Sequence, residues 1–348
     1  MLTDYHLHTT FSLDATQTPD ELCKAALSGG VTHIAITDHV DICPNASGDV
    51  YDIQDPQAYI QAIDEMRERY PQLSIQRGME LGYVPEYWPE AMRRYQQVKP
   101  DFVLGSLHLV NKVDPYEPRY FERRTQREAY TAYLDFLLEA IPRLAQVAQV
   151  LAHLDYVSKF APYADPELRY EDYPKELDAV LEAVIRSGMA LEINTSGYRS
   201  RPATLPGPSV LKRYYLMGGR RITFGSDGHH TQFVGYEMLR AVFFQIAADS
   251  AHVLFALDDA LFDRLQYIQY IDDGIDFHAV FEIGFLHRRT LAAKPLFHAV
   301  DRDDHACDVY LCRALQFGKH FFERFTRRHH VLDNDDFFAI LGLFSHEH

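Results

Sequence analysis

Two patterns of hydrophobic residues alternate over the first 230 residues of this chain: short apolar runs, and apolar residues at helical spacing. Short, mostly apolar runs predict strands at residues 2–8, 32–38, 73–80, 101–107, 148–153, 190–194 and 221–225. Between them, apolar residues recur at helical spacing, as over residues 55–70 and 173–188. Thr18, Pro19 and Gly29 delimit a further helix as its N-cap, first-turn proline and stop. This alternation predicts an α/β fold with parallel strands, a (β/α) barrel one unit short of eight.

The pattern changes beyond about residue 240. Residues 251–348 contain 13 of the 22 Phe and 10 of the 18 His. We therefore expect a barrel over residues 1–248, closed by a helix over 233–246, and an extension of unknown role over 249–348. The extension has two interpretations: a small helical appendage through which copies of the chain form a homo-oligomer, or a product of out-of-frame translation. Its histidines are irregularly spaced, and Cys307 and Cys312 make a poor zinc pattern.

Composition and charge narrow the class of protein. Hydrophobic residues make up 47% and charged residues 24% of the chain, which is ordinary for a globular protein. The net charge of −16 repels nucleic acid, so we expect no nucleic-acid partner, although bound divalent ions would still admit a small anionic substrate. The four cysteines form no CxxC pair, and the sequence has no run of 18 apolar residues and no signal-like start. We therefore expect a cytoplasmic protein with no membrane span.

Metal-binding residue types follow the predicted strands. In a parallel barrel the carboxyl ends of all strands open onto one rim, where active sites lie. Six of the eight histidines in residues 1–250 fall at such ends, together with carboxylates. The candidates at these ends are His6, His8, Asp38, His39, Glu80, His108, His153, Asp227 and His229, and Asp14 follows the first strand. Clusters of these residue types mark metal sites, so the pattern predicts a metal centre.

Nine candidate ligands are too many for one ion. Mixed imidazole and carboxylate donors suit Zn, Mn or Fe better than Ca. We therefore expect two or three divalent ions, bridged by a carboxylate. Such clusters activate water and clamp a phosphoryl group, which favours phosphate ester hydrolysis; amide or ring hydrolysis by a binuclear barrel remains an alternative on chemistry alone.

The motifs in order resemble those of the PHP (polymerase and histidinol phosphatase) superfamily. They read HLHTTFSLD, ITDH, GMELGY, GSLH, AHLD, LEINTSGYRSR and GSDGHH, and the resemblance covers roughly residues 1–235. The histidinol-phosphatase branch is the closer match. The resemblance implies a distorted (β/α)7 barrel, similar to a TIM barrel, with three metal ions. One ion would be held by His6, His8, Glu80 and Asp227, the second by Glu80, His108 and His153, and the third by Asp14, His39 and His229.

The same resemblance implies roles for residues around the metals. Glu80, Asp227 and Asp38 would be catalytic, with Asp38 orienting His39 or a water. Arg199 in NTSGYR resembles a phosphate-binding arginine, and its guanidinium fork suits a phosphate. Lys159 is a further phosphate-binding candidate, and Glu117 is a candidate for a substrate ammonium group.

The implied activity is that of an L-histidinol-phosphate phosphatase in histidine biosynthesis. Its small phosphomonoester substrate would be attacked by a hydroxide activated at the trinuclear site. Two alternatives stay open: a general PHP phosphoesterase acting on nucleotides or nucleic-acid ends, and a non-catalytic PHP module. All nine ligand positions are filled, which argues for catalysis.

Overall fold

The computed structural model describes residues 2–241. The predicted boundary between residues 248 and 249, the extension and its cysteines lie outside the described residues. So does the end of the helix expected over 233–246, of which residues 238–241 are helical within the described part. No helix in residues 2–241 is both long enough and apolar enough to cross a bilayer.

Parallel strands form a nearly closed barrel, which confirms the predicted fold class. Seven strands are paired in the order β1, β2, β4, β5, β6, β7 and β8, and the short β3 pairs with β4. Their bounds are β1 Leu2–Leu7, β2 Val31–Ile36, β3 His39–Val40, β4 Ser74–Gly82, β5 Phe102–Ser106, β6 Val150–Leu151, β7 Ala190–Asn194 and β8 Ile222–Gly225. The barrel closes between its first and last strands through Leu7 and Gly228, where His8 N donates to the Gly228 carbonyl at 3.0 Å.

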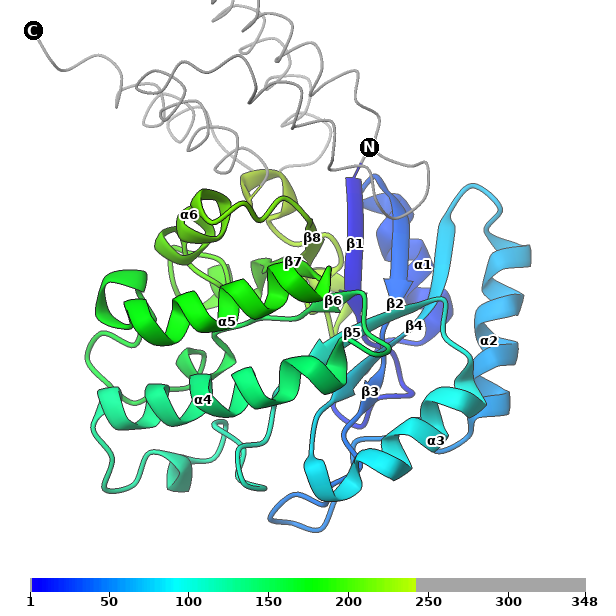
Figure 1. Ribbon diagram of the computed structural model, residues 1–348. Helices are drawn as coiled ribbons and strands as arrows, with labels where there is room; N and C mark the ends of the chain where they lie inside the picture. The colour runs from blue at the N-terminus through cyan, green and yellow to red at the C-terminus, as the bar shows by residue number, and fades with distance from the viewer. Residues whose placement is uncertain (1, 242–348) are drawn as a thin grey trace, which may run out of the picture. The chain divides into compact units, whose positions relative to one another are not determined.

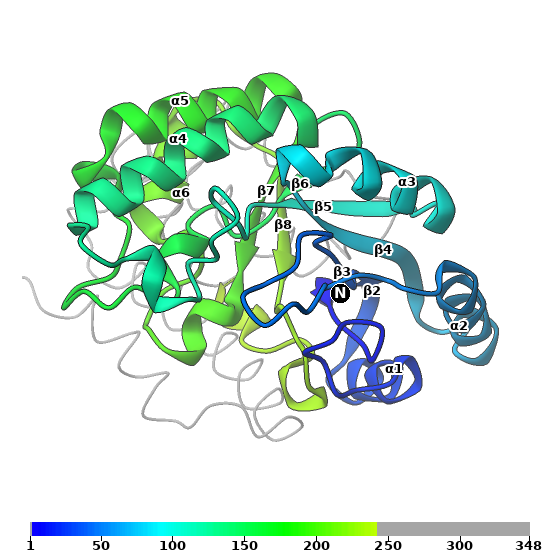
Figure 2. The same cartoon turned by 90° about the horizontal axis from the view of Figure 1, so that it is seen from below.

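Helices surround the strands on the outside (Figures 1 and 2). Their bounds are α1 Pro19–Ser28, α2 Pro56–Arg69, α3 Trp88–Val98, α4 Gln126–Leu144, α5 Pro174–Ser187 and α6 Pro208–Leu216. Short 3-10 turns lie at Pro85–Tyr87, Pro118–Tyr120, Tyr156–Ser158, Tyr170–Asp172, Thr195–Arg199 and Thr231–Phe233. Thr18 caps α1 in a capping box with Glu21, and Thr125 caps α4 in the same way with Glu128. These boxes satisfy backbone N–H groups that a helix start leaves free.

Side chains on the strands pack in two layers. Ile34 and Ile36 of β2 belong to the main core, whereas Ala35 between them belongs to a separate buried cluster. That cluster draws on five strands and comprises Tyr5, Ala35, Phe102, Leu104, Val150, Ala152 and Ala190. Because successive side chains on a strand point to opposite faces, the main core packs against the helices and the second cluster fills the barrel interior. This packing fixes the strand ends that carry the polar residues described next.

Candidate metal centre

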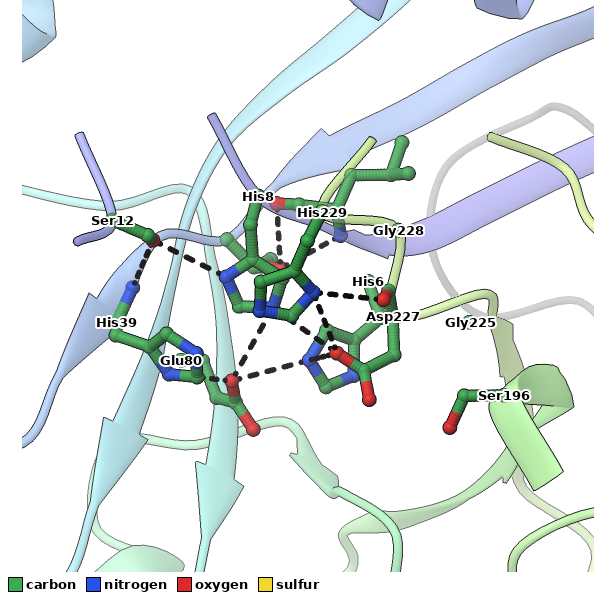
Figure 3. Close-up of polar contacts among 12 residues, drawn as sticks. His6, His8, Ser12, His39, Glu80, Ser196, Gly225, Asp227, Gly228 and His229 are labelled. Carbon is green, nitrogen blue, oxygen red and sulfur yellow. Dashed lines mark hydrogen bonds and ion pairs between the residues drawn. The ribbon is translucent and has the colours of Figure 1, made fainter. Parts of the chain in front are cut away.

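All nine predicted ligands lie at the carboxyl ends of the strands. Glu80 is in β4, His6 is in β1, and His39 begins β3 shortly after the end of β2. Five others follow β1, β5, β6 and β8 within four residues, and Asp14 lies seven residues after β1. Most are buried, and the side chains of Asp14 and His229 are the more exposed members. Figure 3 shows how those on β1, β3, β4 and the loop after β8 point toward one another. The structure therefore brings the nine residues together.

The Glu80 carboxylate lies at the centre of this group. Five histidine nitrogens surround it: His153 Nε2 at 2.8 Å, His39 Nδ1 at 3.0 Å, His108 Nε2 at 3.1 Å, His6 Nε2 at 3.2 Å and His8 Nε2 at 3.5 Å. His153 and His108 approach Oε1, whereas the other three approach Oε2. Because different histidines surround its two oxygens, the Glu80 carboxylate has the geometry to bridge two metal ions.

Asp227 and Asp14 complete the centre on the side of β8. Asp227 Oδ1 lies 3.5 Å from His8 Nε2 and 3.8 Å from His6 Nε2. Asp14 Oδ2 lies 3.3 Å from His229 Nε2 and 3.7 Å from His39 Nε2. Asp227 has a φ of 55°. This left-handed conformation is costly for a non-glycine residue and aims the carboxylate at the histidines.

Burial and mutual charge set the protonation of these groups. Burial raises the pKa of Glu80, but His6, His108 and His39 outweigh it and hold that pKa well below its usual range. Burial, with the charges of His229 and His39, lowers the pKa of His8. Burial lowers the pKa of His6, His39 and His108, but the carboxylates around them outweigh it and raise that pKa well above its usual range. A metal ion that binds these imidazoles would therefore displace a proton from each.

Several buried ligand atoms lie near one another but have no partner in hydrogen-bonding geometry within residues 2–241. They include His6 Nε2, His8 Nε2, His39 Nδ1 and Glu80 Oε2. Three groups of donor atoms lie close enough together to hold an ion each: His6, His8 and Glu80; His39, Glu80 and His108; and His8, His39 and His229. Buried polar atoms without partners are costly, and metal ions would satisfy these. The residues present therefore fit divalent metal.

Two further carboxylates support the histidines from behind, and the sequence reasoning missed both. Glu192 Oε1 lies 2.7 Å from His6 Nδ1, and Asp41 Oδ2 lies 3.0 Å from His108 Nδ1. A carboxylate behind a ligating imidazole fixes its tautomer and orientation. The signal for Glu192 was available, because it is a lone acid in the buried strand Ala190–Asn194 and a buried charge needs a partner.

Glycines make room for these supporting carboxylates. A Cβ at Gly225 would overlap Glu192 Oε1 and the Cβ of His6. A Cβ at Gly82 would overlap Asp41 Oδ1. At both positions any side chain would displace a group that holds a histidine.

Asp38 contacts the loop after β1. Its carboxylate accepts hydrogen bonds from Thr9 N at 2.7 Å, Thr9 Oγ1 at 2.7 Å and Ser12 Oγ at 2.6 Å. Burial raises the pKa of Asp38 to about 6. The backbone N–H of His39 in turn donates to Ser12 Oγ at 3.0 Å. Asp38 therefore holds the loop that follows His8 and, through Ser12, the backbone of His39.

The predicted substrate-binding cations differ in their contacts. Lys159 Nζ lies 2.6 Å from Asp227 Oδ2, so its charge is at the metal centre. Arg199 Nη2 donates to the carbonyls of Ser226 at 2.6 Å and Asp227 at 3.1 Å, and its guanidinium stacks on Phe233. Burial lowers the pKa of Arg199. Its Nε is buried and has no hydrogen-bond partner within residues 2–241.

Comparison with known proteins agrees with this geometry. Residues 4–196 match the model of the PHP domain family. The chain is 30% identical over 243 residues to a probable histidinol-phosphatase of Clostridium acetobutylicum, an alignment that covers 70% of this chain and 92% of the relative. It is 26% identical over 228 residues to a histidinol-phosphatase of Lactococcus lactis, covering 65% of this chain and 83% of that protein.

A solved structure has the same fold. The crystal structure of histidinol phosphate phosphatase from Lactococcus lactis, in complex with zinc, L-histidinol and phosphate, superposes with a TM-score of 0.62. The two chains are 24% identical, and the match covers 70% of this chain and 93% of the other.

Proposed function

Because this chain belongs to the PHP domain family and resembles its histidinol-phosphatases, we propose that it is a metal-dependent phosphatase that converts L-histidinol phosphate and water into L-histidinol and phosphate. The observation that carries the proposal is the convergence of five histidines on Glu80, with Lys159 beside the same centre. Its place would be in histidine biosynthesis, in keeping with the names of the relatives.

We further propose three ions, with Zn, Mn and Fe as the candidate metals. His6, His8, Glu80 Oε2 and Asp227 would hold the first, Glu80 Oε1, His108 and His153 the second, and Asp14, His39 and His229 the third. Within these groups Glu80 Oε2 lies 3.2 Å from His6 Nε2, Glu80 Oε1 lies 2.8 Å from His153 Nε2, and Asp14 Oδ2 lies 3.3 Å from His229 Nε2. His39 also contacts Glu80 Oε2, at 3.0 Å from its Nδ1. Divalent ions, when bound, supply positive charge for the phosphoryl oxygens and activate water as the nucleophile.

The chain's own residues supply the remaining parts of the reaction. Lys159 is placed to bind the substrate phosphate, because its ammonium lies at the centre with a fifth of its side chain exposed. Arg199 would add its Nε–H donor and, through the carbonyls of Ser226 and Asp227, hold the backbone that aims the Asp227 carboxylate. Asp38 acts by positioning, since its carboxylate is engaged by Thr9 and Ser12.

The test is release of inorganic phosphate by the purified protein. L-histidinol phosphate, p-nitrophenyl phosphate and a nucleoside monophosphate would be compared with and without a chelator, followed by restoration with Zn²⁺ or Mn²⁺. We expect chelator-sensitive turnover with the highest kcat/KM for L-histidinol phosphate. A higher kcat/KM for the nucleotide would replace this function by that of a general phosphoesterase. No turnover of any ester by metal-loaded protein would replace it by a non-catalytic role.

A further inference from the structure

Asp114 is a half-buried carboxylate that forms no ion pair within residues 2–241, although the charge of His108 acts on it from a distance. It lies on the loop between β5 and α4, and its Oδ1 accepts hydrogen bonds from Tyr116 N at 2.7 Å and Tyr156 OH at 3.1 Å. Neither bond uses Oδ2, and no Lys, Arg or His within residues 2–241 forms an ion pair with this carboxylate. Burial raises the pKa of Asp114. Because a desolvated charge is costly unless it is paired, this carboxylate is suited to a cation that arrives from outside.

Tyr156 connects Asp114 to the metal centre. The Tyr156 ring lies 4.9 Å from the His108 ring and 5.2 Å from the His153 ring, centroid to centroid. Its hydroxyl is the group that donates to Asp114. The Tyr156 side chain therefore spans the distance between the Asp114 carboxylate and the rings of His108 and His153.

Two exposed aromatic rings lie beside this carboxylate. The side chains of Tyr116 and Phe160 are 65% and 40% exposed, and their rings meet edge to face at 4.8 Å. Phe160 also packs on Tyr156 at 5.9 Å, and Lys159 Nζ lies 5.7 Å from the Phe160 ring. An apolar wall thus lies next to one acid and one phosphate-binding lysine, the kind of lining that orients a small ligand with charge at both ends.

We propose that Asp114, oriented by Tyr156, recognises a positive charge on the alcohol portion of the substrate and thereby determines its specificity. The phosphate would lie at Lys159 and the metal centre, with the rest of the molecule along Tyr116 and Phe160. L-histidinol phosphate fits this arrangement, because it carries an ammonium group and an imidazole ring. The inference rests on the proposed function, since it concerns the same site.

Glu117, the acid suggested by the sequence for a substrate ammonium group, is in a different situation. Its Oε2 lies 2.6 Å from Arg119 Nε, and Arg119 Nη2 donates to its Oε1 at 3.1 Å. This carboxylate already has a cation, whereas Asp114 has none within the described part of the chain. The two acids lie on the same loop, which makes Glu117 the matched comparison.

The experiment compares two esters on the full-length, metal-loaded protein. Steady-state kinetics of wild type, Asp114→Asn, Tyr156→Phe and Glu117→Gln would be measured with L-histidinol phosphate and with p-nitrophenyl phosphate, whose leaving group has no positive charge. Inhibition constants for free L-histidinol and for inorganic phosphate would be measured beside them. Thermal unfolding and metal content would establish which variants are folded and loaded.

For Asp114→Asn we expect kcat/KM for L-histidinol phosphate to fall about 10- to 100-fold, the range for loss of a hydrogen bond to a charged group. The inhibition constant for L-histidinol should rise in parallel, while the values for p-nitrophenyl phosphate and inorganic phosphate stay at the wild-type level. Tyr156→Phe should shift the same two quantities by a smaller factor, because it removes only the hydroxyl that orients the carboxylate.

Equal losses on both esters in folded Asp114→Asn, or no loss on either, would overturn the inference and leave the phosphatase function standing. A selective loss in Glu117→Gln instead would also overturn it. If Asp114→Asn does not fold, Tyr156→Phe decides by the same comparison of substrates. If wild type hydrolyses neither ester, the proposed function fails, and this inference fails with it.

Discussion

Replacing Glu192 by glutamine tests whether the buried carboxylate behind His6 prepares that histidine for metal binding. Glu192 Oε1 lies 2.7 Å from His6 Nδ1, while Oε2 accepts from His153 N at 2.8 Å and from Asn194 Nδ2 at 3.1 Å. The carboxylate therefore accepts on both oxygens. It also holds a proton on Nδ1 of His6, so that Nε2, which faces Glu80, is the nitrogen that would bind a metal ion.

A glutamine cannot satisfy all of these partners. If its oxygen stays toward His153 N and Asn194, its NH2 faces His6 Nδ1 and favours the tautomer with the proton on Nε2, the metal-facing atom. If the amide is flipped, its NH2 faces two donors. Either way at least one charge-assisted hydrogen bond is lost, at about 1.5–3 kcal/mol, which corresponds to a loss of roughly 10- to 100-fold in metal affinity.

The assay is competition for Zn²⁺ between the protein and a chromophoric chelator. Glu90→Gln is the matched control, because it makes the same chemical change on the exposed face of α3, where Glu90 pairs with Arg93 at 2.8 Å. The unfolding midpoint of the metal-free proteins separates loss of affinity from loss of the fold. If folded Glu192→Gln holds the same number of ions with wild-type affinity, the positioning role of Glu192 is refuted.

Three further predictions follow from the metal centre and the capping boxes. Chelation should abolish phosphate release and lower the unfolding midpoint, since the buried ligands lose their counter-charge; unchanged melting with and without chelator would contradict this. Gly225→Ala should destabilise the protein by about 1–3 kcal/mol in urea unfolding, because its Cβ would overlap Glu192 and His6, and wild-type stability would exclude that clash. Hydrogen bonds from Thr125 lower the pKa of Glu128 below 4.5, so its contribution to stability is complete above that pH and is lost as pH falls through the folded-state pKa. Glu128→Gln should therefore reduce the fall in the free energy of unfolding as the pH is lowered. An unchanged fall would show that the Thr125–Glu128 capping box contributes nothing to stability.

The order of the elements and most of the candidate ligands follow from the amino-acid sequence alone. Short apolar runs predicted seven strands, and helical spacing predicted the helices between them, because both patterns are local properties of the chain. Most of the candidate ligands could be named because parallel strands place their carboxyl ends on one rim, so position along a strand translates into position at the site. Asp14 was added by the resemblance to the PHP superfamily. The capping residue Thr18 was found for the same local reason.

Which atoms face each other depends on the three-dimensional packing of the barrel. Glu192 and Asp41 act on histidines far away along the chain, and their partners depend on strand register and on the space left by Gly225 and Gly82. The contrast between Asp114 and Glu117 also emerged only in three dimensions, since both are acids on one loop and, within residues 2–241, Glu117 lies against an arginine whereas Asp114 does not. Periodicity specifies which face of an element is buried, whereas contacts between residues distant in sequence depend on how the whole barrel closes.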